Sequence, residues 1–143
     1  MPTANDVATY FIKRGSEAED TGMSNLKLQK LLYYAQGYHL AVFNAALFDD
    51  AIEAWTHGPV CPAINRAFKG FGRGPIEVNH ALPNVFTGEQ LELLEEVYEV
   101  FGQFSAWKLR DMTHEETPWR EHEAQGSTIP PAELQRYFAT RLN

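Results

Sequence analysis

The stretch Ser24–Val42, SNLKLQKLLYYAQGYHLAV, decides the fold of this chain. It opens as helices do, because Ser24 is a capping residue and Met23 and Leu28 have the spacing of a hydrophobic staple. Apolar residues then recur at helical spacing in two neighbouring stripes, so that most of the circumference is apolar. Helices of this kind are normally enclosed by other elements. We therefore predict a central helix around which one core is built.

A narrow polar strip formed by Lys27, Lys30 and Tyr34 interrupts the apolar surface of this helix. We expect the helix to reach the surface along this strip, which would then form part of a protein-binding face. The alternative is that Lys30 is paired with a carboxylate for a structural purpose.

The composition describes an ordinary globular protein, with 44% hydrophobic and 22% charged residues among 143. We expect one domain over residues 1–143, large enough to fold without disulfides or metals. No apolar run could span a bilayer, and no secretory signal opens the chain. A single cysteine fits a reducing cytoplasm. The net charge of −7 argues against nucleic acid as a partner and favours another protein.

Seven helical segments and one short hairpin are expected along the chain. Residues 52–56 alternate between apolar and polar side chains, as a half-exposed strand does, and 76–78 are the expected partner strand. The fold class is therefore mainly α: a compact single-domain helical bundle around the central helix, with a two-stranded hairpin. The predicted helices span 3–15, 24–42, 59–71, 87–102, 105–112, 117–126 and 130–142.

Trp55 and His57 share one face of the predicted strand, and Gly58-Pro59 follows directly. A rigid turn is a favourable place to present an aromatic anchor to another protein. We therefore add both residues to the predicted protein-binding face. The alternative is that Trp55 packs inside the core.

Glu92, Glu95, Glu96 and Glu99 form a second candidate for protein binding, because their spacing of i, i+3, i+4 and i+7 places them on one helical face. The chain has no lysine or arginine between Arg73 and Lys108 to offset them. Such a run is either a solvated face or the counterpart of a basic partner.

A catalytic or metal site finds little support. His57 and Cys61 lie four residues apart, which raises the alternative of a small cysteine hydrolase, yet no orienting group or catalytic signature accompanies them. The five histidines and Cys61 lack the paired spacing of zinc ligands. We expect no catalytic residue, no metal and no cofactor.

Three segments resemble the Panacea antitoxin domain family, which includes SocA-like proteolytic adaptors and phage-associated GepA-like proteins. The segments are SNLKLQKLLYYAQGYHLA, LFDDAIEAWTHGPVCPAINRAFKGFG and FSAWKLRDMTHEETPW, in that order. The resemblance extends from about Val7 to Phe138, and its most specific parts are Leu26–Gln36 and Ile52–Val60.

This resemblance implies a mainly helical antitoxin that neutralises a cognate protein toxin by direct stoichiometric binding. The toxin would usually be encoded in the adjacent gene, in bacterial or prophage DNA. An alternative, implied by the SocA-like branch, is a proteolytic adaptor that delivers the toxin to the ClpXP protease. Some family members carry an added helix-turn-helix domain at the amino end, for which we expect no room here.

Overall fold

The computed structural model describes residues 1–17 and 22–142, and it confirms the mainly helical class with one short two-stranded sheet. Residues 18–21 of the loop after the first helix lie outside the described part. Within that part, no helix is both long and apolar enough to cross a bilayer. The helices are α1 Ala4–Glu17, α2 Asn25–Phe43, α3 Pro62–Phe68, α4 Gly88–Phe101, α5 Ala106–His114, α6 Thr117–Arg120 and α7 Pro131–Ala139, and the strands are β1 Glu53–Trp55 and β2 Gly58–Val60.

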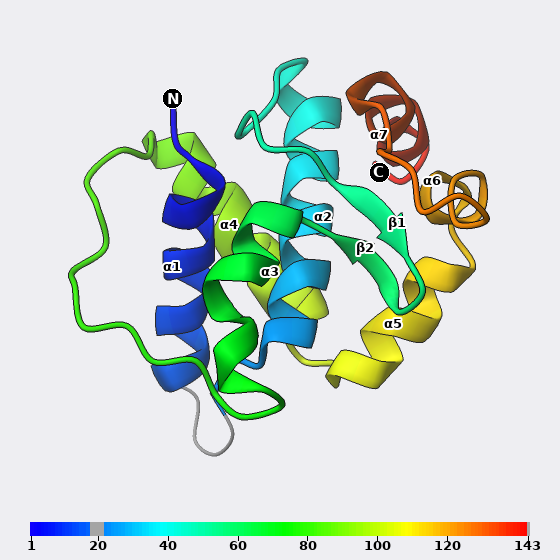
Figure 1. The fold of residues 1–143 in the computed structure, drawn as a ribbon. Helices are drawn as coiled ribbons and strands as arrows, with labels where there is room; N and C mark the ends of the chain where they lie inside the picture. Colours follow the sequence, from blue (N-terminus) through cyan, green and yellow to red (C-terminus); the bar gives the residue numbers. More distant parts are fainter. Residues whose placement is uncertain (18–21, 143) are drawn as a thin grey trace.

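Helix α2 lies at the centre of the molecule, between α1 and α4 on one side and α7 on the other (Figure 1). Its first turn is capped as predicted, because the Ser24 side chain accepts a hydrogen bond from the amide of Lys27. Asn44, in the left-handed conformation, ends the helix. Most of α2 is enclosed, as its two apolar stripes require, and only its last turn leaves Val42 exposed.

Helix α7 approaches α2 so closely that a side chain at Gly37 would collide with it. A Cβ atom built at Gly37 would fall inside contact distance of the Phe138 ring. The absence of a side chain at this position therefore lets an aromatic ring of the last helix lie directly on the backbone of the central helix. This contact closes the core at the carboxyl end of the chain.

The hairpin differs from its prediction in its second strand. β1 pairs antiparallel with β2, and Trp55 lies opposite Gly58 across a turn formed by Thr56 and His57. The predicted pairing with residues 76–78 is wrong, since the amide of Ile76 donates to the carbonyl of Met23 instead. Gly58, with φ of 105°, supplies the conformation that this tight reversal needs.

Candidate functional site

The polar strip of the central helix does not reach the surface. The side chain of Lys30 is 0% exposed and that of Tyr34 is 1% exposed, so the prediction that these two residues form a surface strip is wrong. The Lys30 ammonium donates to the carbonyl of Pro59 at 3.2 Å. The partner of Lys30 is thus a backbone carbonyl of the hairpin and not the carboxylate that the alternative prediction gave it. Tyr34 stacks on Phe101, with ring centroids 3.9 Å apart.

Lys27, the third residue of the strip, is half-buried. Its ammonium donates to the carbonyl of Gly102 at 2.6 Å, at the carboxyl end of α4. A cation at this position also interacts favourably with the negative end of the helix dipole. Lys27 therefore ties the start of α2 to the end of α4.

Two adjacent tyrosines of α2 hold one buried carboxylate. Tyr33 and Tyr34 donate to the two oxygens of Glu116 at 2.8 and 2.9 Å. Burial raises the pKa of the Glu116 carboxyl to about 7, although both hydrogen bonds act in the opposite direction. The corner between α5 and α6 is thus anchored to the central helix.

Two glutamines of α2 hold further segments. The Gln29 oxygen accepts from the amide of Cys61 at 2.8 Å, at the start of α3. Gln36 donates to the carbonyl of Phe48 and accepts from the amide of Leu47, both at 2.7 Å. Together with Lys30 and the two tyrosines, these glutamines form buried hydrogen bonds from α2 to the hairpin, to the loop before it and to the segments before α3 and α6.

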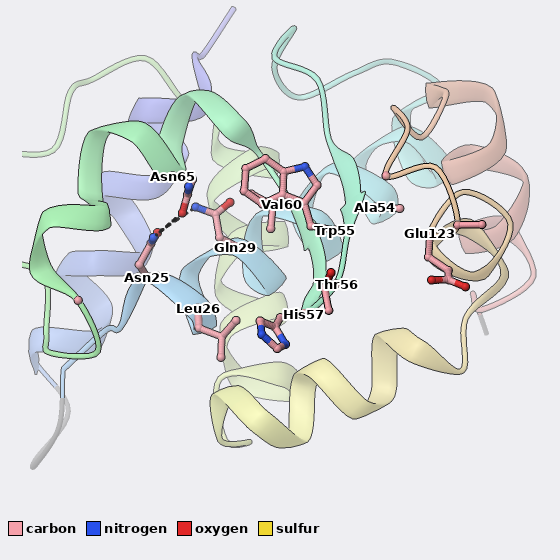
Figure 2. A pocket seen from close by; sticks show the side chains of 13 residues that line it. Asn25, Leu26, Gln29, Ala54, Trp55, Thr56, His57, Val60, Asn65 and Glu123 are labelled. Carbon is pink, nitrogen blue, oxygen red and sulfur yellow. Dashed lines mark hydrogen bonds between the residues drawn. The ribbon is translucent and has the colours of Figure 1, made fainter.

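A cleft of about 650 Å³ lies beside the hairpin, and it contains both residues predicted there as a binding face, Trp55 and His57. Figure 2 shows Asn25, Gln29 and Asn65 of α2 and α3 along one side, and Trp55 and His57 of the hairpin facing the same space. The loop after α6 supplies Glu123, Ala124 and Gly126. Three segments far apart in sequence therefore form this hairpin cleft.

Trp55 is held in place from two directions. Its indole nitrogen donates to the carboxylate of Glu53 at 2.9 Å, and its carbonyl accepts from the indole of Trp119 at 2.7 Å. The side chain is half-buried. Trp55 is therefore neither a fully exposed surface anchor nor a fully enclosed core residue. A ring fixed in this way loses little conformational entropy when another surface covers it.

His57 is exposed at the tip of the hairpin and lies edge-on to Trp107, with ring centroids 5.7 Å apart. Trp107 is itself 51% exposed. A second depression of about 310 Å³ shares His57 and Leu26 with the hairpin cleft and adds Arg73 and Trp107. The hollowed surface therefore continues from the hairpin onto the first turn of α5.

The predicted acidic face is only partly a solvated face. Glu92, Glu96 and Glu99 are exposed on α4. Glu95 instead pairs with Arg14 of α1 at 2.7 Å, which supplies the counter-charge that the local sequence lacks. Helix α1 lies beside α4 in the fold, so a cation far away in the sequence reaches this carboxylate.

The hydrolase alternative meets an unfavourable environment. Cys61 is 1% exposed, and burial raises the pKa of its thiol, so the reactive thiolate is disfavoured. His57 is exposed on the turn, while Cys61 faces the core at the start of α3. Among the described residues, no three His, Cys, Asp or Glu side chains are grouped as a metal site would need.

Comparison with known proteins identifies the family. A sequence model described as "Antitoxin SocA-like, Panacea domain" matches residues 28–120, which is more than half of the chain. Antitoxin SocA of Caulobacter vibrioides (strain NA1000 / CB15N) is 33% identical over 129 residues, covering 81% of this chain and 68% of that protein. The chain belongs to the SocA-like Panacea antitoxin family. No solved structure matches it.

The segment Leu26–Gln36, which carries part of the resemblance to the Panacea domain, has a structural role. Its polar residues Gln29, Lys30, Tyr33, Tyr34 and Gln36 are buried and hold other segments. The polar residues of this segment therefore stabilise the fold. Among the predicted binding residues, His57 on the hairpin and Glu92, Glu96 and Glu99 on α4 are exposed.

The sequence pattern did not place Asn65, Glu123 or Ala124 at the hairpin cleft, or Trp107 at the depression beside it. None of these four residues belongs to a sequence pattern that indicates a binding surface. Their separation in sequence is the reason, because only the packing of α3, α5 and the loop after α6 brings them to the hairpin. The alternating strand pattern was the one signal that pointed to this surface.

Proposed function

We propose that this protein is an antitoxin that neutralises a cognate protein toxin by direct stoichiometric binding, and that the hairpin cleft is its principal binding surface. Membership of the antitoxin family supports the partner class. The observation that carries the choice of surface is Trp55, half-buried and fixed by two hydrogen bonds at a cleft of about 650 Å³. Rigid aromatic anchors in concave surroundings are the usual centres of protein interfaces.

Neutralisation by occlusion requires only a complementary surface. The exposed imidazole of His57 and the indole of Trp107 beside it extend the aromatic surface beyond Trp55 into the adjoining depression, and Glu123 provides a charged rim. A toxin segment seated there would contact three separate segments of the antitoxin at once. The toxin would therefore bind the folded antitoxin and would bind the unfolded antitoxin poorly, because unfolding separates these three segments.

The test is co-expression with the protein of the adjacent gene, with growth and co-purification as readouts. Ala124 lines the cleft and is exposed, so Ala124→Arg should block it sterically without disturbing the core. Ala81→Arg, at an exposed loop position outside the cleft, is the matched control. We expect Ala124→Arg to lose growth rescue and co-purification and Ala81→Arg to keep both.

Other outcomes would contradict parts of the proposal. Binding by Ala124→Arg and His57→Ala at the level of the unsubstituted chain would show that the cleft is the wrong surface. Growth rescue without a complex of fixed stoichiometry would contradict direct occlusion. Rescue that is lost in cells lacking ClpXP would identify the protein as an adaptor that delivers its toxin for degradation.

A further inference from the structure

A second groove lies at the other end of α2, and it shares no lining residue with the hairpin cleft. It has a volume of about 390 Å³ and is formed by the last turns of α2, by α4 and by the chain after α7. Tyr38 and Val42 of α2 lie on one side, Val97 and Val100 of α4 on the other, and Leu142 at the carboxyl end. We call it the α2–α4 groove.

Large apolar side chains are left open to solvent along this groove. Val42 and Val100 are each 51% exposed, and Leu142 is 42% exposed. Single exposed apolar residues are common on protein surfaces and need no explanation. Several that line one concave surface are instead typical of an interaction site.

The rim of the groove on the α4 side is acidic. Glu96 lines the groove, one helical turn before Val100. Glu92 and Glu99 are exposed on the same helix at i−4 and i+3 from Glu96, so the three carboxylates follow the apolar edge in one stripe. Glu95 lies outside this stripe, because its carboxylate is directed to Arg14 on α1.

One cation, Arg141, is found among the described residues that line the groove. None of the ion pairs among the described residues joins Arg141 to Glu92, Glu96 or Glu99. The surface is amphipathic, with an apolar floor and one acidic border.

We propose that the α2–α4 groove binds a basic amphipathic helix of the toxin, an inference that rests on the proposed antitoxin function. A helix fits because its apolar residues at i, i+3, i+4 and i+7 form a stripe that can enter a groove between two helices. Lysine or arginine residues beside that stripe would meet Glu92, Glu96 and Glu99 at the rim.

Charge decides against other occupants of the groove. A second copy of this chain would bring the same acidic stripe, in a protein with a net charge of −7, and like charges would oppose the contact. A bilayer carrying anionic lipids would be repelled for the same reason. A cationic partner helix satisfies both the apolar floor and the acidic border.

The test uses a dye-labelled synthetic peptide of leucine and lysine patterned as an amphipathic helix, with a leucine–glutamate peptide of the same pattern as the control. Fluorescence anisotropy should show binding of the lysine peptide to the full chain, weakening as sodium chloride rises. The glutamate peptide should not bind. Val100→Ser should weaken binding about tenfold, because an exposed apolar contact is lost while the core is untouched.

Charge-reversed pairs separate groove binding from general attraction to an acidic protein. Glu96→Lys with Glu99→Lys should abolish binding of the lysine peptide. Glu77→Lys with Glu121→Lys changes the net charge equally at exposed positions outside the groove and should retain binding. Equal losses in the two double variants, or full binding by Val100→Ser, would overturn the inference. Only variants whose thermal midpoint equals that of the unsubstituted chain are compared, so that a loss of binding does not reflect unfolding.

Co-expression distinguishes failure of this inference from failure of the proposed function. If the unsubstituted chain rescues growth and the Glu96→Lys, Glu99→Lys variant rescues and captures toxin equally well, the groove assignment alone is wrong. If the unsubstituted chain does not rescue, the antitoxin function is wrong, and the peptide measurements then decide the chemistry of the groove. A dimer in sedimentation that Val100→Ser dissolves would assign the groove to a second copy and overturn the inference.

Discussion

Lys30 shows at the scale of one residue how a lysine can be enclosed with no ionic partner among the residues that the structure describes. Its side chain is 0% exposed, and its ammonium donates to a backbone carbonyl of the hairpin. Desolvation, assisted by the nearby charge of Arg110, lowers the pKa of this amine to about 7. Near neutral pH a large fraction of the group is uncharged, which reduces the cost of burying it.

Gly58 is the residue that lets the hairpin lie on Lys30, and Gly58→Ala should therefore destabilise the protein. A Cβ atom there would come within 2.6 Å of Lys30 Cε and 2.9 Å of Thr113 Oγ1, at a φ of +105° that side chains rarely adopt. We expect a loss of about 2 kcal/mol or more in the free energy of unfolding, measured by denaturant titration.

Gly70→Ala is the matched control for this substitution. No atom lies within 4 Å of a Cβ built at Gly70, so its effect should stay within about 0.5 kcal/mol. Equal effects of the two substitutions would contradict the close packing of the hairpin on the Lys30 side chain.

Glu116 should make stability fall as pH rises. Its carboxyl pKa is raised from 4.5 to about 7 in the folded protein. Between these values the folded chain retains a proton that the unfolded chain has released, so the stabilisation present below pH 4.5 is lost as pH rises towards 7. The shift corresponds to at most about 3 kcal/mol.

Glu116→Gln isolates this titration, because its amide can still bond Tyr33 and Tyr34 but does not ionise. Thermal midpoints of the two proteins should be compared from pH 4.5 to 7. We expect the unsubstituted chain to lose stability relative to Glu116→Gln as pH rises. A difference that stays constant over this range would show that Glu116 does not titrate there.

At the scale of the element, α2 stabilises the loops around it through its polar side chains as well as its apolar ones. Gln36 makes hydrogen bonds to the backbone of Leu47 and Phe48. This loop lies between α2 and the hairpin, so its geometry also determines where β1 begins. The element thus positions the candidate binding surface without being part of it.

Gln36→Leu should loosen that loop. The substitution keeps the volume but leaves the Leu47 amide and the Phe48 carbonyl unpaired, each at a cost of about 1–3 kcal/mol. Hydrogen exchange at Leu47 and Phe48 should accelerate, and the thermal midpoint should fall. Gln103→Leu, at an exposed position after α4 where the side chain bonds the carbonyl of Val100, should leave exchange at Leu47 and Phe48 unchanged. Unchanged exchange in Gln36→Leu would show that the loop is held by other contacts.

At the scale of the whole molecule, all parts of the fold depend on one helix, so unfolding should be cooperative. Helices α1, α4, α5 and α7 and the hairpin all pack against α2. Leu31 is 0% exposed, and Leu31→Ala should cost about 2–5 kcal/mol. Tryptophan fluorescence and far-UV circular dichroism should report the same lowered midpoint. Separate midpoints would show that the α2 core is not shared.

The sequence by itself determined the helical class, the central helix with its Ser24 cap, a short strand at residues 52–56 and the family. It placed the partner of that strand at 76–78, whereas the partner is Gly58–Val60. These features depend on local patterns: apolar periodicity, capping residues and alternation in a short strand. Each pattern acts over a few residues, so the chain displays it without reference to the rest of the fold. The family followed from motifs that are equally local.

Only the tertiary structure decided which polar residues face water. Lys30 and Tyr34 have the pattern of a solvated strip, yet Pro59 and Glu116 reach them from distant segments and bury them. Glu95 has the pattern of an acidic face, yet Arg14 neutralises it. A polar side chain can be satisfied by solvent or by a buried partner. The local sequence is the same in both cases. Whether such a side chain faces solvent or a buried partner is determined only when separate segments pack together.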